Sequence, residues 1–350
     1  MARGGSASQA GTGSVSRPRA TVMRDVARLA GVSHQTVSRV LNNHPNVRQE
    51  TRDRVVQAME ALNYRRNLAA RTLVTRRSGT LGIVGFESTL FGPASMLYAI
   101  EDAARAAGYF VTVATVRRLD RQSVLDAVDR LAQQSVEGII AISPKPAVTN
   151  ALVQVASVLA CVGVGAAGDD AVPTVRVDNR AGAALATRHL LDLGHATVHH
   201  IAGPPDWPEA VERVDGWRET LYAAGAVVPP VHPREWTARS GYEQGQKLAA
   251  DPAVTAIFCA NDQIALGVLR ALHEAGRRVP DDVSVVGFDG MPDSEYFLPP
   301  LTTVRQDFAE LGRRSIDMLL RKIDSTGQPA EHMLLEPELI LRDSAGAARS

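Results

Sequence analysis

The chain has 350 residues, a length that predicts two or three domains. Hydrophobic residues make up 45% and charged residues 22%, which is typical of a soluble protein with a substantial core. No run approaches the roughly 20 apolar residues of a membrane-spanning helix, which argues against a membrane partner. The net charge is zero, yet residues 1–80 hold 14 arginines against 4 acidic residues, so +10 at one end balances −10 elsewhere. This asymmetry predicts that only the N-terminal part binds a polyanion such as nucleic acid.

The first 20 residues are rich in Gly, Ser and Ala, and no apolar segment follows their arginines. We interpret residues 1–20 as a disordered leader rather than a secretory signal. Cys161 and Cys259 both lie in apolar, strand-like runs. They are therefore expected to be buried free thiols of a protein in the reducing cytoplasm.

Three short helical patterns within residues 21–66 predict a DNA-binding domain. The first covers residues 23–30 and ends at Gly31, the second begins after Ser33 as N-cap, and the third covers about residues 51–62. Gly31 and Val32 leave too little chain for an ordinary loop between the first two helices. Such a tight turn, with a glycine that tolerates positive φ, is typical of a helix-turn-helix.

The second helix presents polar side chains suited to the major groove of DNA. Glutamine can pair bidentately with adenine, and arginine with guanine. The alternative is a three-helix protein-interaction module with a solvated polar face, which the spacing of the small and apolar residues disfavours. The expected base contacts come from His34, Gln35 and Arg39, and the expected phosphate contacts from Thr36, Ser38 and Asn42.

The stretch VMRDVARLAGVSHQTVSRVLN resembles the DNA-binding head of the lac repressor family. The segments LNY, ANDQIALG and PPLTTVRQDF extend the resemblance from about residue 21 to residue 342. The resemblance implies that residues 67–78 form a hinge helix that folds on operator DNA and inserts Leu73 into the minor groove, where an apolar wedge bends the duplex. Read without the resemblance, this short basic segment would be a marginal helix, so a passive linker stays an alternative.

Residues 79–342 alternate apolar strands with amphipathic helices, in two successive series. Continuous apolar strands between helices predict parallel sheets covered on both faces. The fold class is therefore α/β, with two doubly wound subdomains in a periplasmic-binding-protein-like core that binds the effector and dimerises. Ligands bind at the carboxyl ends of such strands and in clefts between subdomains.

Polar residues at these strand ends are the candidate ligand contacts. Asn261 and Asp289 each end a strand, and Gln306 ends LTTVRQD, which we expect to cross back between the subdomains. Arg213 is expected early in the first helix of the second subdomain, and Trp236 in a loop. Together they offer the hydrogen-bonding groups and the aromatic plate that a pyranose needs. The alternative for Asn261 and Asp289 is helix capping and turn formation.

The resemblance assigns these residues to the family's effector pocket and adds an apolar wall. It also expects an aspartate where this chain has Gly165 and a serine where it has Phe86. These two departures fit a sugar effector without marking it as a galactoside. The implied effector-binding set is Leu90, Met96, Arg213, Trp236, Asn261, Asp289, Gln306 and Phe308.

Other chemistry finds little support in the sequence. His195, His199 and His200 straddle a loop and a strand, which disfavours a metal site, and the glycines between Gly163 and Gly168 lack the helix that a dinucleotide site needs. We therefore expect no cofactor, no metal and no enzymatic activity. Alternatives are a sugar-binding transport component, an enzyme with an accessory head, and a regulator whose corepressor is a purine or sugar phosphate.

The tail, residues 343–350, lacks the leucine-heptad helix through which a member of this family forms tetramers. We expect a homodimer on a roughly palindromic operator. An inducer acts only if it binds the DNA-incompetent arrangement more tightly than the competent one.

Overall fold

The computed structural model describes residues 21–41, 44–64, 77–86, 89–118, 120–142, 146–165, 172–325 and 329–348. The chain divides into two compact units, residues 1–76 and residues 77–350, here called the N-terminal unit and the core unit.

The described residues of the N-terminal unit form the helices α1 (Met23–Ala30), α2 (His34–Leu41) and α3 (Gln49–Ala61). Val26, Val37 and Val55, one from each helix, are fully buried against one another in its core. Gly31 ends α1 with a φ of 63°, as the predicted tight turn requires. The backbone N–H of Thr36 donates to Ser33 Oγ at 3.2 Å, so Ser33 caps α2 as predicted.

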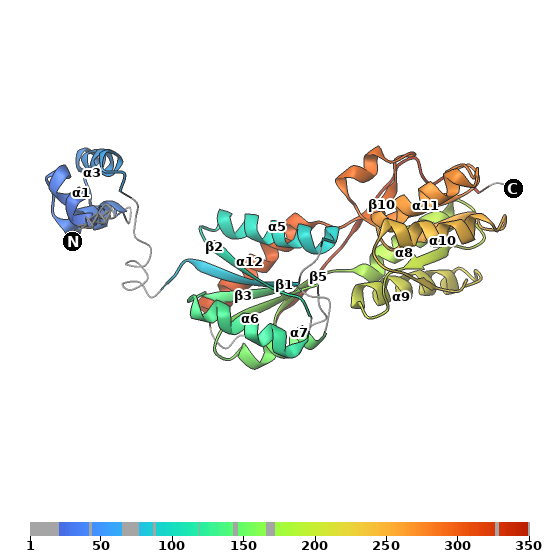
Figure 1. Ribbon diagram of the computed structural model, residues 1–350, viewed down its shortest axis with the longest axis horizontal. Helices are drawn as coiled ribbons and strands as arrows, with labels where there is room; N and C mark the ends of the chain where they lie inside the picture. Colours follow the sequence, from blue (N-terminus) through green and yellow to red (C-terminus); the bar gives the residue numbers. More distant parts are fainter. Residues whose placement is uncertain are drawn as a thin grey trace, which may run out of the picture. The chain divides into compact units, whose positions relative to one another are not determined.

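The first subdomain of the core unit contains a parallel six-stranded sheet in the order β11-β5-β4-β3-β1-β2. Helices α5 and α12 cover one face of this sheet, and α6 and α7 cover the other (Figure 1). Its strands are β1 (Thr80–Phe86), β2 (Phe110–Val116), β3 (Gly138–Ile142), β4 (Ala160–Val164), β5 (Thr174–Val177) and β11 (His332–Leu335). Its helices are α5 (Phe91–Ala106), α6 (Arg121–Gln133), α7 (Pro146–Val155) and α12 (Phe308–Asp324).

The second subdomain contains a six-stranded sheet in the order β12-β10-β9-β8-β6-β7, in which β12 alone is antiparallel to its neighbour. Helices α10 and α11 pack on one face, and α8 and α9 on the other. Its strands are β6 (His199–Ala202), β7 (His232–Pro233), β8 (Ala256–Cys259), β9 (Ser284–Asp289), β10 (Thr302–Arg305) and β12 (Glu338–Ile340). Its helices are α8 (Asn179–Asp192), α9 (Pro208–Ala223), α10 (Ala238–Ala249), α11 (Asp262–Glu274) and the short 3₁₀ helix η1 (Pro292–Tyr296).

The described chain crosses between the two sheets at three places, from β5 to α8, from β10 to α12 and from β11 to β12. The crossing after β10 was expected from the sequence. The sequence had suggested that Arg213 lies in the first helix of the second subdomain. Arg213 lies instead on α9, the second helix, because α8 already belongs to this subdomain. Helix α8 was not predicted from the sequence, because its many alanines leave no clear helical pattern of large apolar residues.

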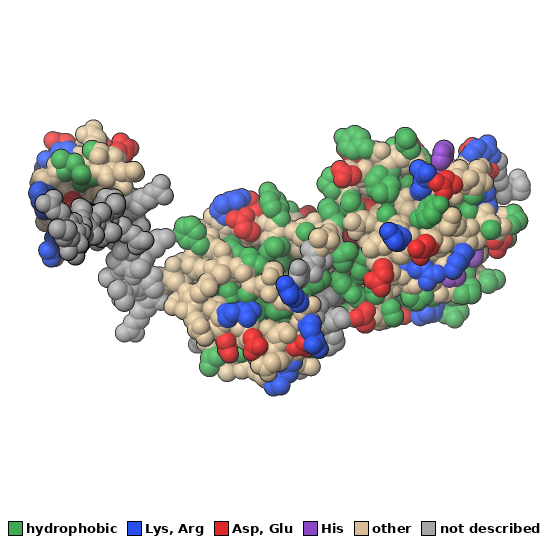
Figure 2. All heavy atoms as spheres, in the orientation of Figure 1, with side chains coloured by type: hydrophobic (Ala, Val, Ile, Leu, Met, Phe, Trp, Pro, Cys, Tyr) green, Lys and Arg blue, Asp and Glu red, His purple; other side chains and the backbone are tan. Residues whose placement is uncertain are grey.

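The segment after β12 packs onto the second sheet. Ser344 is fully buried, and its hydroxyl donates to the carbonyl of Val285 and accepts from the N–H of Thr302. Further along, the N–H of Ala348 donates to the carbonyl of Leu193. Residues 343–348 therefore contribute to the core. On the face seen in Figure 2, positive and negative side chains are interspersed over the core unit.

Candidate functional site

A cavity with an empty volume of about 640 Å³ lies between the two subdomains of the core unit. This size is within the range of about 300–1,000 Å³ that small-molecule sites occupy. The first subdomain lines it with Phe86, Leu90, Phe91, Gly92, Pro93, Met96, Ile142, Val164, Gly165 and Val177. The second lines it with Asn179, Trp207, Glu209, Arg213, Trp236, Asn261, Asp289 and Gln306. One wall is thus largely apolar and the other largely polar.

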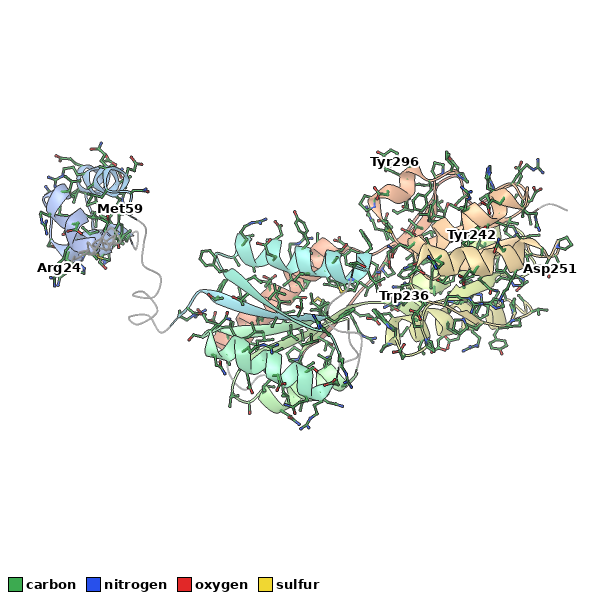
Figure 3. All side chains as sticks on the ribbon, viewed as in Figure 1. Arg24, Met59, Trp236, Tyr242, Asp251 and Tyr296 are labelled. Atoms are coloured by element: carbon green, nitrogen blue, oxygen red, sulfur yellow. The ribbon has the colours of Figure 1, made fainter. Side chains whose placement is uncertain are left out.

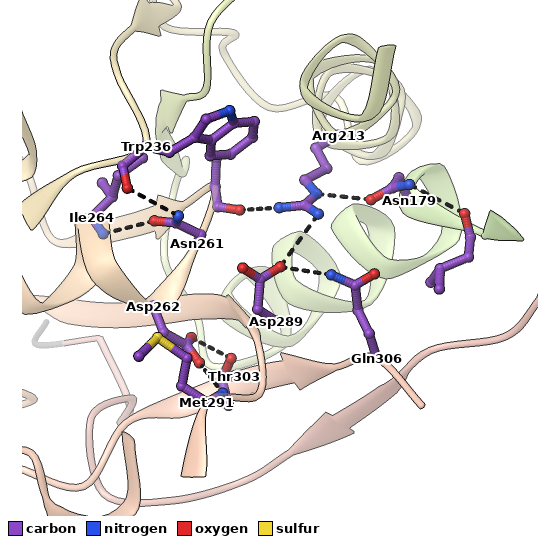
Figure 4. Close-up of polar contacts among 12 residues, drawn as sticks. Asn179, Arg213, Trp236, Asn261, Asp262, Ile264, Asp289, Met291, Thr303 and Gln306 are labelled. Atoms are coloured by element: carbon purple, nitrogen blue, oxygen red, sulfur yellow. Dashed lines mark hydrogen bonds and ion pairs between the residues drawn. The ribbon is translucent and has the colours of Figure 1, made fainter. Parts of the chain in front are cut away.

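Arg213 is the centre of the polar wall and is almost fully buried. Its Nε donates to Asn179 Oδ1 at 2.9 Å, Nη1 donates to the carbonyl of Ala260, and Nη2 lies 3.4 Å from Asp289 Oδ1 (Figure 4). The guanidinium carbon also lies 3.7 Å from the ring centroid of Phe288, a cation–π contact. Arg213 therefore ties α8, α9 and the ends of β8 and β9 into one rigid frame.

Asp289 ends β9 and is buried beside Arg213. Its Oδ1 also accepts a hydrogen bond of 2.6 Å from Gln306 Nε2, which lies in the crossing after β10. Burial raises the pKa of Asp289, while Arg213 and Gln306 oppose that rise by favouring the carboxylate. The hydrogen bond from Gln306 therefore links the buried pair of Arg213 and Asp289 to a chain segment that connects the two subdomains.

Asn261 combines a capping role with a place in the cavity wall. Its Oδ1 accepts the N–H of Ile264 at 2.7 Å, which caps α11, and its Nδ2 donates to the carbonyl of Trp236 at 3.4 Å. Trp236 lies on the side of the second subdomain that faces the first (Figure 3). Asn261 is thus a helix cap, as the alternative had it, and the same side chain also contacts the backbone of Trp236.

The apolar wall comes from the start of α5 and from aromatic contacts across the cavity. Leu90 is the N-cap residue of α5, and Met96 lies on this helix six residues further on. The ring of Trp207 meets those of Phe86 and Trp236 edge-on, each with centroids 5.6 Å apart. Phe86 and Gly165, the two departures noted in the sequence, both line this part of the cavity.

Phe308 is the predicted pocket residue that does not itself line the cavity. It begins α12 and packs against Phe91 with ring centroids 5.8 Å apart. Phe91 does line the cavity. Phe308 therefore stands one side chain behind the wall.

The predicted DNA-reading residues lie on the outer side of α2. His34, Gln35 and Arg39 are exposed, and Thr36 and Ser38 are half-buried. The hydroxyls of Ser33 and Thr36 are hydrogen-bonded at 2.9 Å. Asn42 and Leu73, the remaining predicted DNA contacts, lie outside the described residues.

Residues 22–67 match the family described as bacterial regulatory proteins, lacI family, and residues 187–345 match a periplasmic binding protein-like domain. The chain is 37% identical over 327 residues to the lactose operon repressor of Escherichia coli (strain K12), covering 91% of this chain and 89% of that repressor. The chain belongs to the lacI family of bacterial regulatory proteins.

Other lacI-family proteins are also similar along nearly the whole chain. The HTH-type transcriptional regulator CelR of Thermobifida fusca is 36% identical, with 94% of this chain and 99% of CelR covered. The HTH-type transcriptional repressor PurR of Histophilus somni (strain 129Pt) is 31% identical, with 92% and 98% covered. A crystal structure of the lac repressor dimer bound to operator and the anti-inducer ONPF aligns with a TM-score of 0.83 at 34% identity, covering 94% of this chain and 100% of that chain.

These likenesses confirm the fold class predicted for this lacI-family chain, a helix-turn-helix head and a two-subdomain periplasmic-binding-like core. The relatives are named as transcription regulators. None of the described helices has both the length and the apolar character needed to cross a membrane. Among the described residues, no group of three or more His, Cys, Asp or Glu side chains could hold a metal ion.

Sequence reasoning missed several cavity residues of this lacI-family chain, notably Asn179, Trp207 and Glu209. Glu209 could have been found, because it precedes Arg213 by four residues and so shares its face of α9. Asn179 could not, because its position depends on α8, which the sequence pattern did not reveal.

Proposed function

We propose that this lacI-family chain is a sequence-specific transcriptional repressor that a small sugar releases from its operator. The cavity between the subdomains carries the proposal. Its lining combines an arginine, carboxylates and amides with aromatic rings. The polar groups can bind the hydroxyls of a pyranose, and the rings can pack against its C–H face. The lac repressor and CelR are related proteins that have been crystallised with ONPG and with cellobiose.

The same residues offer a route from ligand to DNA. Asn179 begins α8 directly after one crossing, and Gln306 lies within another. A ligand held by these side chains would favour one angle between the subdomains over another. Since an effector shifts an equilibrium only through differential affinity, this coupling is worth about 1–3 kcal/mol in typical cases.

The DNA-binding part of the proposal assigns residues 21–66 to the operator. His34, Gln35 and Arg39 would reach base edges from the exposed side of α2. Residues 67–78 would form the hinge and residues 79–342 the effector-binding and dimerisation core, in a cytoplasmic homodimer on a pseudo-palindromic site. No turnover of the bound sugar is expected.

Selection from random double-stranded DNA by the purified full-length chain tests the proposal without knowledge of the operator. The expected product is a pseudo-palindrome, and Gln35→Ala should lose it. A thermal-shift screen of sugars, sugar phosphates and purines then identifies the effector, since a ligand at 100 times its Kd adds about 2.7 kcal/mol.

The effector found in the screen should release the selected DNA in a mobility-shift assay. Tighter DNA binding with a purine or a sugar phosphate would instead establish the corepressor alternative. A sugar that binds without changing DNA affinity, or that is chemically converted, would contradict the proposal.

A further inference from the structure

We propose that Glu209 is a specificity-determining contact that selects a neutral, hydroxyl-donating sugar and excludes anionic ligands such as sugar phosphates. This inference rests on the proposed function, since it takes the cavity between the subdomains as the effector site. It goes further by naming the charge class of the ligand and the residue that reads it.

Glu209 is placed in the cavity wall by its position on α9. Glu209 lies in the first turn of α9 and lines the same cavity as Arg213, four residues later on the same helix face. Its Oε2 is buried and has no hydrogen-bond partner among the described residues. A buried acceptor without a partner is costly. A hydroxyl group of a bound sugar would supply the missing donor.

The described residues of the cavity wall include more acidic than basic side chains. Arg213 lies beside Asp289 and also donates to Asn179 and to the carbonyl of Ala260. The neighbouring carboxylate of Glu212 is paired with Arg176. Glu209 thus adds a second carboxyl group to a wall whose one cation already faces Asp289. An anionic ligand would be repelled in this poorly solvated space, whereas a neutral one would not.

Protonation of Glu209 follows from the same surroundings. Burial raises its pKa to about 7, Arg213 on the same helix opposes that rise, and Glu212 and Asp289 add to it. A hydroxyl that donates to Glu209 favours the ionised form. Sugar binding should therefore be tighter at pH 8 than at pH 6, because at pH 6 the carboxyl group must first lose its proton.

A purely structural role is the competing explanation. An acidic residue in the first turn of a helix interacts favourably with the helix dipole, and Glu209 occupies such a position after Pro208. A structural role would change stability but would leave ligand preference and its pH dependence unaltered. Affinity measurements therefore separate the two.

The experiment is calorimetric titration of the full-length wild-type chain, Glu209→Gln and Glu219→Gln with a panel of neutral mono- and disaccharides and hexose 6-phosphates. Glu219 is a matched control, because it lies on α9 outside the cavity wall and pairs with Arg180 at the surface. The wild type should bind at least one neutral sugar and none of the phosphates. Glu209→Gln should bind that sugar about tenfold more weakly at pH 8, and Glu219→Gln within about twofold of the wild type.

The pH arm compares the same proteins at pH 6 and pH 8. Arg213, Glu212 and Asp289 are common to all three proteins, so a pH dependence that Glu209→Gln alone loses belongs to Glu209. Neutral-sugar binding that Glu209→Gln leaves unchanged would overturn the inference and leave the proposed function intact. Binding of phosphates alone would also overturn it. Absence of any ligand would refute the effector site itself, and the inference with it.

Discussion

At the scale of single residues, Asp289 combines backbone strain with a buried charge. Its φ of 98° lies in a region that residues other than glycine rarely adopt. Such conformations persist where the surroundings hold them, and they cluster at functional sites. Here the hydrogen bonds from Gln306 and Arg213 to the carboxylate hold the residue in place.

Asp289→Asn should separate ligand recognition from DNA binding. Asparagine tolerates positive φ and keeps the shape, but it leaves the buried guanidinium of Arg213 without its facing charge. We expect the affinity for the sugar found in the screen to fall at least tenfold. Operator affinity, measured by mobility shift, should stay within about twofold, since Asp289 belongs to the core unit and not to the N-terminal unit that holds the expected base contacts. A folded variant that no longer binds operator would contradict this prediction.

Gly203→Ala should displace the aromatic plate of the cavity. A Cβ at Gly203 would come within 2.2 Å of the Trp236 ring. Overpacking of this kind typically costs about 1–3 kcal/mol, and the moved ring should also weaken sugar binding. Gly85→Ala is the control, because its Cβ would meet no atom within 4 Å. Denaturant unfolding and calorimetry measure the two effects, and equal behaviour of the two variants would count against the prediction.

The polar cavity residues were predictable from the sequence to the extent that they end strands. Asn261, Asp289 and Gln306 follow apolar runs, and strand ends meet at one edge of a parallel sheet. Arg213 and Trp236 needed the family resemblance, because a helix face and a loop carry no comparable signal. Phe308 shows that the family resemblance does not decide the exact place of every side chain. Whether a side chain lines a wall or stands behind it depends on packing, here on Phe91.

At the scale of elements, the strands of both sheets were predictable, apart from the short strands β7, β11 and β12. Strand β12 has only three residues, and its antiparallel pairing with β10 is set by the chain's third crossing. Helices α8 and α10 escaped notice because small residues occupy their packed faces. Gly182 against Phe288 and Gly241 against the backbone of Ile264 leave no room for a Cβ. Close helix packing thus removes the apolar periodicity from which helices are predicted.

The carboxylate of Glu137 anchors the chain at the start of β1. Glu137 accepts from Arg77 Nε and from the N–H of Gly79, each at 2.6 Å, and Arg77 also donates to the hydroxyl of Tyr109. The side chain of Glu137 is only 8% exposed. Arg77 is the first residue of the core unit, so this contact anchors the chain where it enters the first sheet.

Glu137→Gln should loosen that anchor. We expect a loss of about 1–2 kcal/mol in the free energy of unfolding, because the hydrogen bonds from Arg77 and from the N–H of Gly79 to a charged group are weakened. Operator affinity should fall more than sugar affinity, since the anchor lies next to the proposed hinge and away from the cavity. Glu331→Gln, a half-exposed ion-pair partner of Arg321, serves as the control. Equal losses in both affinities would show that the anchor has no special link to DNA binding.

At the scale of the whole molecule, buried acids make stability depend on pH. Asp262 is fully buried between Thr303 and the N–H of Met291, and burial raises its pKa to about 8. The folded state therefore keeps a proton that the unfolded state loses near pH 4. This contribution to stability is fully present below pH 4, declines as the pH rises, and is lost above about pH 8.

Between pH 6.5 and 8, His189, His195, His199, His200 and His232 add little to this dependence, since burial lowers the pKa of each in the folded protein. The free energy of unfolding should therefore fall over this interval by about 1 kcal/mol or more. Asp262→Asn should flatten the slope, because an amide reproduces the protonated acid: its NH₂ faces Thr303 Oγ1 and its oxygen accepts from Met291. Urea titrations at several pH values measure this, and an unchanged slope in the variant would contradict it.

The three crossings have a consequence for how the protein is made. The first subdomain is discontinuous in sequence, because α12 and β11 complete a sheet that begins at residue 80. During synthesis the N-terminal unit has all its residues early, whereas the first subdomain lacks a helix and an edge strand until residue 335 has been translated. Domains otherwise tend to fold in order as they emerge. A nascent chain would therefore carry a complete DNA-reading head before it could respond to any effector.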